Sequence, residues 1–236
     1  MTSTLGHEFR PSLQITKVPR DTPTGVVSTA GVEGVAISET PHVAQRAAFY
    51  VVIVCWWLFA LTFWLRKRPP RAPEAKRDRT SLIGLFLQAV AYFSVGFYPL
   101  QQREFSPVTS ESRVVEWGLA VLTVAIAIAS VWLVNAAARR LGKQWALAAR
   151  LVEGHTLIRD GPYRFVRNPI YTGMFGMLLA TGLAAGRWIP LLVAIVLFAA
   201  GTYIRIRSEE RLLRQAFGSE FEQYARNVPA LIPGIY

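Results

Sequence analysis

Two polar segments carry the side chains that could do chemistry. The first, residues 161–173, packs arginines, tyrosines and the pair Asn168-Pro169 into thirteen residues just before a long apolar stretch. The second contains Arg205 and Glu209 directly after another apolar stretch. Ionisable groups at the edge of a membrane span are costly unless they have a partner or a task. The two segments therefore predict a site for a charged small molecule.

The first segment has the signals of a turn followed by a helix start. Asn168 is a favoured N-cap residue, and Pro169 suits the first helical position because its missing N–H is not needed there. The free N–H groups of such a helix end attract carboxylates. Gly161-Pro162 predicts a turn that folds the segment back on the helix start. Plain anchoring of Tyr and Arg at lipid headgroups is the alternative that residue types alone leave open.

The second segment begins with paired charges. Arg205 and Glu209 are four residues apart, as are Glu210 and Arg214, so each pair shares one face of a helix. Such pairs on an exposed helix would contribute only a few tenths of a kcal/mol. Their position at the end of an apolar stretch favours a role in the predicted site over that of ordinary surface ion pairs.

A further helix is expected after this one. Gly218 predicts the end of the first helix, and residues 219–222 have the Ser-x-x-Glu spacing of a capping box. The second helix is expected to run to Asn227, with Phe221 and Tyr224 on its apolar side. An amphipathic helix of this kind could lie on the membrane surface and cover the site.

Five apolar stretches must position these segments. A bilayer core needs roughly 20 apolar residues per helix, and the stretches that approach this length are 47–65, 82–100, 114–138, 170–185 and 189–204. Only three residues separate the last two, which predicts an antiparallel hairpin. The expected fold is all-α: a polytopic membrane protein with about five transmembrane helices, a C-terminal helical hairpin and cytoplasmic amphipathic helices that form the site.

The basic residues assign the orientation. They gather between the first and second stretches, between the third and fourth, and after the fifth, whereas the opposite loops hold only Arg103, Arg113 and Arg187. Basic loops stay in the cytoplasm. Both polar segments and the C-terminus are therefore expected on the cytoplasmic side, and the N-terminal tail on the opposite side.

Composition excludes several other classes. The 236 residues are 52% hydrophobic with a formal net charge of +11, and basic residues lie between apolar blocks, as is typical of membrane proteins rather than nucleic-acid-binding ones. The single Cys55 excludes a disulfide framework and a Cys-based metal site. No phosphate-binding glycine motif occurs. Residues 1–45 have no signal-peptide pattern and predict a flexible tail.

The two polar segments, in this order around an apolar hairpin, resemble the isoprenylcysteine carboxyl methyltransferase family of integral membrane enzymes. The first family motif, roughly His-x-Leu-Val, Gly-x-Tyr and Arg-His-Pro-x-Tyr-x-Gly, is matched by residues 155–158, 161–163 and 167–173. The second motif is matched by Arg205, Glu209-Glu210, Phe217-Gly218, Tyr224 and Val228-Pro229. The resemblance covers about residues 140–236, and Asn168 stands where the family usually has His.

The resemblance implies S-adenosylmethionine (SAM) as methyl donor, bound from the cytoplasm. Hydropathy alone predicts the tail at 1–45 and three transmembrane helices at 46–138, and the resemblance implies a methyltransferase core at 139–236. Arg205 is implied to meet the acceptor's carboxylate as the catalytic residue, and no metal is implied. The residues implied to line the cofactor are His155, Thr156, Leu157, Ile158, Tyr163, Asn168, Pro169, Ile170, Tyr171 and Glu209.

Methyl transfer to a carboxylate suits these residues, because that nucleophile is already ionised and needs no general base. The expected acceptor is amphipathic, lipid-like or prenylated, and enters from the bilayer. Membrane lipids are the other partner, with no nucleic acid and no obligate protein partner. Three alternatives stay open: phospholipid N-methylation, an NADPH-dependent sterol-type membrane reductase, and a non-enzymatic membrane scaffold or haem- or lipid-handling protein.

Overall fold

The computed structural model describes residues 43–65, 74–77, 80–96, 113–142, 150–152, 156–186 and 188–232. Residues 1–42 of the predicted tail lie outside this set, and its last three residues belong to the first helix, which begins at Val43.

Helices make up nearly all of the described structure. In chain order they are α1 (Val43–Trp64), α2 (Thr80–Gly96), α3 (Arg113–Leu141), the 3-10 helix η3 (Gly161–Arg164), α4 (Pro169–Ala185), α5 (Trp188–Phe217) and α6 (Ser219–Asn227). Each of the five predicted apolar stretches forms one helix. By length and composition α1, α3 and α5 are able to cross a bilayer, whereas α2 and α4 are apolar but shorter, at 17 residues each.

The described part of the chain is helical as expected, apart from one short strand pair that the sequence did not predict. Strands β1 (Glu74–Arg77) and β2 (Arg150–Val152) pair antiparallel, with Glu74 opposite Val152 and Arg77 opposite Arg150. Both strands belong to the basic segments that the sequence predicts on one side of the membrane. These residues have weak strand propensity, but pairing provides hydrogen-bond partners for backbone N–H and C=O groups of both segments.

Helix α5 is longer than predicted. The apolar stretch was expected at 189–204, followed by a helical segment from Arg205 that ends at Gly218, and a single helix of 30 residues runs through both. No Gly or Pro interrupts residues 202–217, so nothing in that part of the chain breaks the hydrogen-bond ladder. Arg205 and Glu209 therefore lie on the same continuous helix as the apolar residues 189–204.

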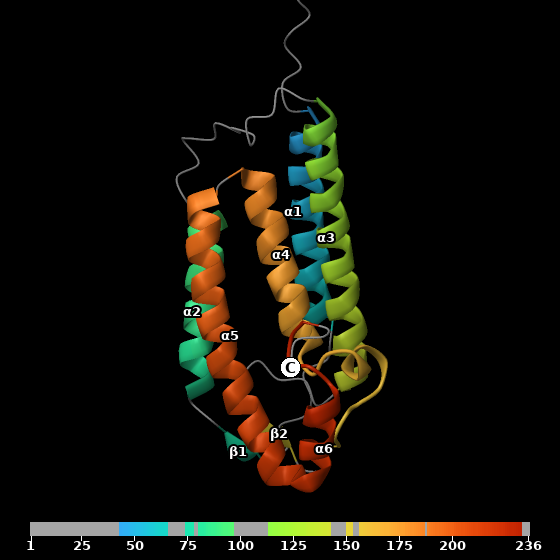
Figure 1. Ribbon diagram of the computed structural model, residues 1–236, viewed down its shortest axis with the longest axis vertical. Coiled ribbons are helices and arrows are strands. Elements are labelled where there is room, and N and C mark those ends of the chain that lie inside the picture. Colours follow the sequence, from blue (N-terminus) through green and yellow to red (C-terminus); the bar gives the residue numbers. More distant parts are fainter. Residues whose placement is uncertain are drawn as a thin grey trace, which may run out of the picture. The chain divides into compact units, whose positions relative to one another are not determined.

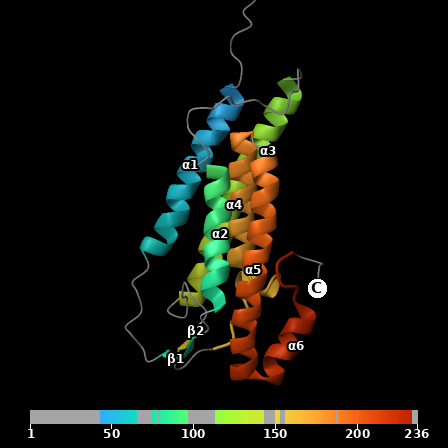
Figure 2. The same cartoon turned by 90° about the vertical axis from the view of Figure 1, so that its left-hand side faces the viewer.

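The hairpin of α4 and α5 joins two groups of helices (Figures 1 and 2). Helix α4 packs against α1 and α3 as well as α5, and α2 packs along α5. The hairpin turns at Gly186, whose φ of 64° lies in the left-handed region and whose N–H bonds to the carbonyls of Gly182 and Leu183. This is the usual glycine end of a helix.

Small residues allow the helices to approach closely. A methyl group at Gly176 of α4 would overlap Oγ of Ser130 on α3, and one at Gly173 would lie 2.9 Å from the Ser130 carbonyl oxygen. Membrane helices pack in this way because their association depends on van der Waals contact and buried hydrogen bonds. Between α2 and α5, Gln88 donates to the hydroxyl of Thr202 at 2.8 Å.

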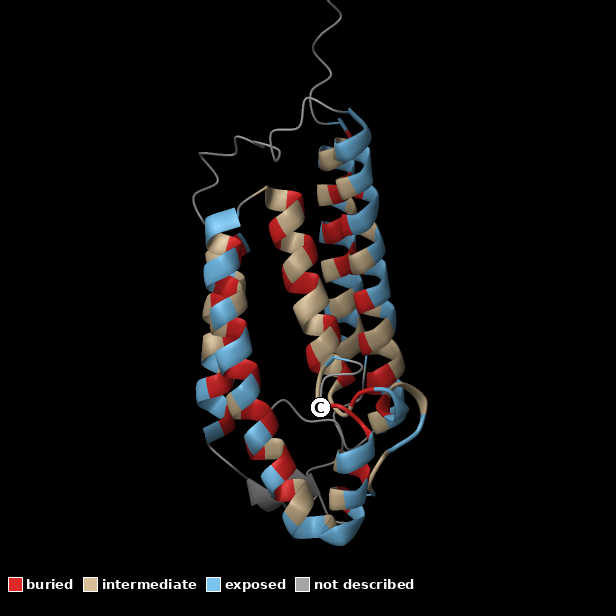
Figure 3. Cartoon of the chain, in the orientation of Figure 1, coloured by how far each residue is buried: buried red, intermediate tan, exposed pale blue. Residues whose placement is uncertain are grey.

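Buried residues form stripes along the helices, and the remaining faces are exposed (Figure 3). Exposed large apolar side chains are common on α1, α2, α3 and α5, among them Trp57, Phe86, Val121, Trp132, Leu192 and Val196. A soluble protein rarely exposes so much contiguous apolar surface, and this distribution is suited to contact with lipid.

Candidate functional site

The start of α4 is bonded to the end of the chain that follows α6. The backbone N–H of Arg167 donates to the Pro229 carbonyl at 2.8 Å, and that of Asn168 donates to the Ala230 carbonyl at 3.1 Å. The two polar segments singled out in the sequence therefore meet in space, as Figure 1 shows where the red segment after α6 reaches the lower end of α4.

The predicted start of α4 is confirmed, with Asn168 at the N-cap position and Pro169 as the first helical residue, whereas the capping box predicted at Ser219 is wrong. Asn168 does precede α4, but its side chain makes no cap hydrogen bond and its Nδ2 donates to the Ala230 carbonyl at 3.1 Å. Helix α6 is preceded by Gly218, with φ 50°, so that Ser219 is its first helical residue rather than its cap. In both places tertiary contacts or backbone geometry replaced the local side-chain cap.

Three predicted site residues form one polar cluster between α4 and α5. The hydroxyl of Tyr171 donates to Oε1 of Glu209 and accepts a 2.7 Å hydrogen bond from Nε of Arg205. The guanidinium carbon of Arg205 lies 5.3 Å from the centre of the Tyr171 ring, and its Nη2 lies 3.6 Å from Glu209 Oε1. Tyr171 and Arg205 are buried, whereas the Glu209 side chain is 29% exposed. We call these residues the Tyr171 cluster.

A second set of charges ties the first segment to α5 and α6. Nε of Arg167 donates to Glu210 Oε1 at 2.9 Å, and Nη1 of Arg167 donates to the carbonyls of Ala225, at 2.7 Å, and Val228. Both charged side chains are largely buried, at 13% and 7% exposure. Arg214 also contacts Glu210, at 3.2 Å, but is more exposed. The Arg167–Glu210 pair is therefore an internal connection rather than a surface ion pair.

A cavity of about 80 Å³ lies between these elements. Its wall combines aromatic and aliphatic side chains with an amide, a hydroxyl and a pair of opposite charges. The lining residues are Leu141, Thr156, Leu157, Ile158, Tyr163, Arg167, Asn168, Glu210, Leu213, Phe221 and Tyr224.

The structure divides the predicted cofactor residues between the cavity and the cluster. Those that line the cavity are Thr156, Leu157, Ile158, Tyr163 and Asn168, while Tyr171 and Glu209 belong to the Tyr171 cluster with Arg205. Pro169 is buried and Ile170 half-buried at the start of α4, and neither is among the residues that line the cavity. His155 lies outside the described residues.

Several lining residues are absent from the predicted cofactor residues, although Phe221 and Tyr224 were expected on the apolar side of a helix that covers the site. Leu213 and Glu210 lie nearly one helical turn apart on α5, and Phe221 and Tyr224 have the same spacing on α6. The spacing of these two pairs, and not motif membership alone, is the signal that could have identified them. Arg167 was noted only as part of a motif.

The apolar face of α6 closes the cavity. Phe221 and Tyr224 are buried and pack with Leu157, Leu213 and Phe217, so this face contacts the chain itself rather than a membrane surface. The Tyr224 hydroxyl donates to the Tyr163 carbonyl at 2.6 Å. Burial raises the pKa of Tyr224 to about 12, although the positive charges of Arg167 and Arg159 act in the opposite direction.

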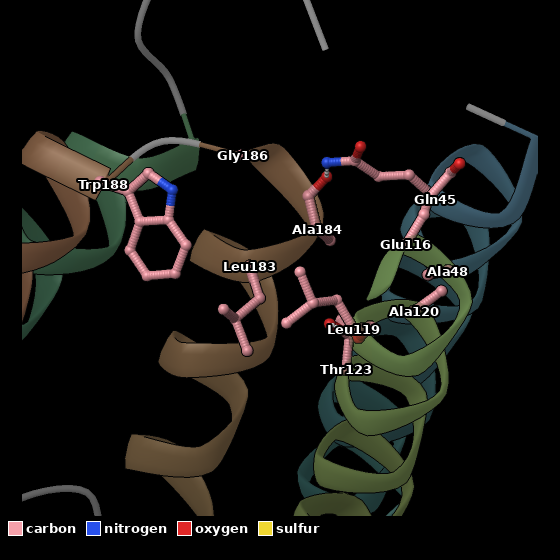
Figure 4. A pocket seen from close by; sticks show the side chains of 10 residues that line it. All are labelled: Gln45, Ala48, Glu116, Leu119, Ala120, Thr123, Leu183, Ala184, Gly186 and Trp188. Carbon is pink, nitrogen blue, oxygen red and sulfur yellow. Dashed lines mark hydrogen bonds between the residues drawn. The ribbon is translucent and has the colours of Figure 1, made fainter. Parts of the chain in front are cut away.

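Another cavity lies at the far end of the helices, where the end of α4 faces α1 and α3 (Figure 4). Gln45, Glu116 and Trp188 are among its lining residues, and Gln45 Nε2 approaches the Ala184 carbonyl at 3.5 Å. It contains no residue of either sequence motif. Within the described ranges, no group of three or more His, Cys, Asp or Glu side chains is placed to hold a metal ion.

Known proteins match the part of the chain that builds the site. The profile of the family described as Phospholipid methyltransferase matches residues 119–220, from within α3 to the start of α6. The chain is 38% identical over 88 residues to the protein-S-isoprenylcysteine O-methyltransferase of Schizosaccharomyces pombe, covering 37% of each chain. It is 31% identical over 84 residues to protein-S-isoprenylcysteine O-methyltransferase B of Arabidopsis thaliana, covering 36% of this chain and 43% of the relative.

A third relative has a different kind of name. The cobalt-zinc-cadmium resistance protein CzcN of Cupriavidus metallidurans is 34% identical over 94 residues, covering 39% of this chain and 43% of the relative. The chain thus spans about two fifths of the length of each of these relatives. On the matched segment and both motifs, the C-terminal part of this chain is similar to isoprenylcysteine carboxyl methyltransferases.

Proposed function

We propose that this protein is an integral membrane methyltransferase that uses SAM and methylates a carboxylate on an amphipathic acceptor. Helices α1 to α5 all cross the bilayer, and residues 139–236 form a methyltransferase core on the cytoplasmic side. One observation carries the proposal: the Tyr171 cluster, which lies in the matched segment, is within one turn of the cavity-lining residues Asn168, at the start of α4, and Glu210, on α5.

The chemistry of the cavity suits SAM. Aromatic side chains from η3 and α6 offer surfaces for an adenine ring, and Asn168 and Thr156 offer hydrogen bonds. The Glu210 carboxylate and the Arg167 guanidinium supply opposite charges for an amino acid portion that carries both. The volume of about 80 Å³ is smaller than the roughly 300–1,000 Å³ of typical small-molecule pockets. SAM binding at this place would therefore need more room than the cavity offers in this structure.

When bound, SAM supplies a methyl group on a positively charged sulfur, and transfer to a carboxylate oxygen leaves a neutral thioether and a methyl ester with no proton released. Arg205 provides a buried positive charge that attracts an anionic acceptor group. Tyr171 and Glu209 fix the direction of that guanidinium through the 2.7 Å hydrogen bond and the ion pair. Positioning of this kind is the main contribution the residues make to the rate.

The same contacts favour a carboxylate over an amine as acceptor. An amine would lose a proton on methylation and would need a base. Both carboxylates of the Glu209-Glu210 doublet accept hydrogen bonds, Glu209 from Tyr171 and Glu210 from Arg167. Glu209 is also paired with Arg205, and Glu210 with Arg214. Neither is placed as an unengaged base, so phospholipid amines are the less suitable acceptors.

The test uses purified full-length protein in lipid nanodiscs. SAM binding is measured by calorimetry, and transfer of a labelled methyl group is measured to a farnesylated cysteine with a free carboxylate and, as the matched control, to its carboxamide. Tyr171→Phe is expected to lower acceptor turnover by about 10- to 100-fold, because a hydrogen bond to charged groups contributes about 1.5–3 kcal/mol. Its SAM affinity should stay close to wild type.

Each of these measurements can contradict the proposal. The absence of saturable SAM binding to the wild-type protein would refute a SAM-dependent enzyme. SAM binding with methylation of phosphatidylethanolamine but not of the farnesylated cysteine would replace the acceptor by a phospholipid amine. Stabilisation by NADPH and not by SAM would favour a reductase instead.

A further inference from the structure

The contact between α2 and α5 brings a helix from outside the matched segment up to the Tyr171 cluster. A methyl group added to Gly84 of α2 would lie 2.6 Å from Cγ of Arg205 and 2.5 Å from the carbonyl oxygen of Gly201. Real Cβ atoms essentially never come within 3.0 Å of another heavy atom. Only a residue without a side chain therefore fits at this position.

A second close approach at the same crossing does not involve Arg205. A methyl group at Gly201 of α5 would lie 2.6 Å from the Gly84 carbonyl oxygen and 3.0 Å from Cβ of Leu87. Nearby, the buried hydrogen bond from Gln88 to Thr202 fixes how far α2 can slide along α5. The two helices are thus held together at the level of Gly84 and Gly201.

The Arg205 side chain packs along the surface of helix α2. The Arg205 side chain is only 5% exposed, and its Cγ lies beside Gly84 while its Nε reaches the Tyr171 hydroxyl at 2.7 Å. An arginine has many rotamers, so the shape of this surface contributes to selecting the one that meets Tyr171.

We propose that Gly84 is a positioning residue for Arg205 and that α2 is consequently part of the active site. The missing side chain of Gly84 leaves the space through which Arg205 extends toward Tyr171. The inference rests on the proposed function, in which Arg205 is the group that meets the acceptor. A shift of about 1 Å in a positioning group can lower a rate by about 100-fold.

Gly84→Ala and Gly201→Ala form a matched pair for the test. Both place a methyl group 2.5–2.6 Å from the carbonyl oxygen of the opposite helix, but only the first also reaches Arg205. With the full-length protein in nanodiscs, Gly84→Ala is expected to lower kcat/KM for the farnesylated cysteine about 100-fold relative to Gly201→Ala. The Kd for SAM should be similar in the two variants. Equal losses of kcat/KM in both variants would overturn the positioning role.

A double-mutant cycle, with melting temperature (Tm) as the readout, tests the proposal even if Gly84→Ala folds poorly. Arg205→Ala removes the Cγ atom, so Gly84→Ala should lower Tm less in that background than in the wild type, whereas Gly201→Ala should lower it equally in both. An equal effect of Gly84→Ala in both backgrounds would show that it acts only on the helix backbone and would overturn the proposal. The cycle uses neither SAM nor acceptor, so failure of SAM binding in the wild type refutes the proposed function separately.

Discussion

The buried Arg167–Glu210 pair should control how often α6 opens. Replacing Arg167 by Met leaves a shorter, unbranched apolar side chain and removes the donors to Glu210, Ala225 and Val228. Breaking a buried pair typically costs about 3–5 kcal/mol. The lower end applies here, because Arg214 still contacts Glu210 at 3.2 Å. A loss of about 3 kcal/mol corresponds to an opening equilibrium about 100-fold more favourable.

Hydrogen exchange followed by mass spectrometry measures this opening without any ligand. Peptides from residues 219–232 should exchange about 100-fold faster in Arg167→Met, since amide exchange in α6 proceeds through local opening. Peptides from α3 (Arg113–Leu141) should be unchanged. The matched control is Arg214→Met: its side chain is 39% exposed, so its ion pairs should contribute less than about 1 kcal/mol.

Two results would refute this reasoning. If exchange in residues 219–232 stays at the wild-type rate in Arg167→Met, the pair does not hold α6 in place. If α3 accelerates as much as α6, the substitution destabilises the whole bundle and the pair has no local role. Equal acceleration by Arg167→Met and Arg214→Met would also show that burial of the pair does not determine its contribution.

Two further predictions concern packing and pH. Gly176→Ala should lower the free energy of unfolding by about 1–3 kcal/mol through overlap with the Ser130 hydroxyl, and thermal melting should show most of this loss restored in a Ser130→Ala background. Burial raises the pKa of Tyr224 to about 12 from an ordinary value of 10, so its proton stabilises the fold below pH 10 and this contribution is lost between pH 10 and 12. Tyr224→Phe should therefore show a smaller fall in melting temperature across that range, and an identical fall in the two proteins would contradict the assignment.

The positions of the long helices could be predicted because hydropathy and helix length depend on local sequence. The five apolar stretches coincide with α1 to α5, and the turn at Gly186 follows from a short connection that contains glycine. The meeting of Tyr171 with Glu209 was also expected, since both residues lie at the same end of the α4–α5 hairpin.

The details that failed depend on tertiary contacts. Asn168 has the right type and position for a cap, but a carbonyl from the end of the chain, Ala230, competes for its side chain. The strand pair joins segments more than seventy residues apart, and neither strand has an alternating apolar pattern. The contact of Gly84 with Arg205 depends on the register between α2 and α5, which no local signal specifies.

The Glu209-Glu210 doublet shows why two adjacent acids are needed. Successive residues of an α-helix point about 100° apart, as 3.6 residues complete one turn. Glu209 consequently faces Tyr171 and Arg205, while Glu210 faces Arg167 and the cavity under α6. One carboxylate could not reach both partners. The doublet therefore connects the end of α5 both to the Tyr171 cluster and to the contact that holds α6 over the cavity. Under the proposed function, a change at Glu209 should affect acceptor methylation, and a change at Glu210 should affect opening of the cavity.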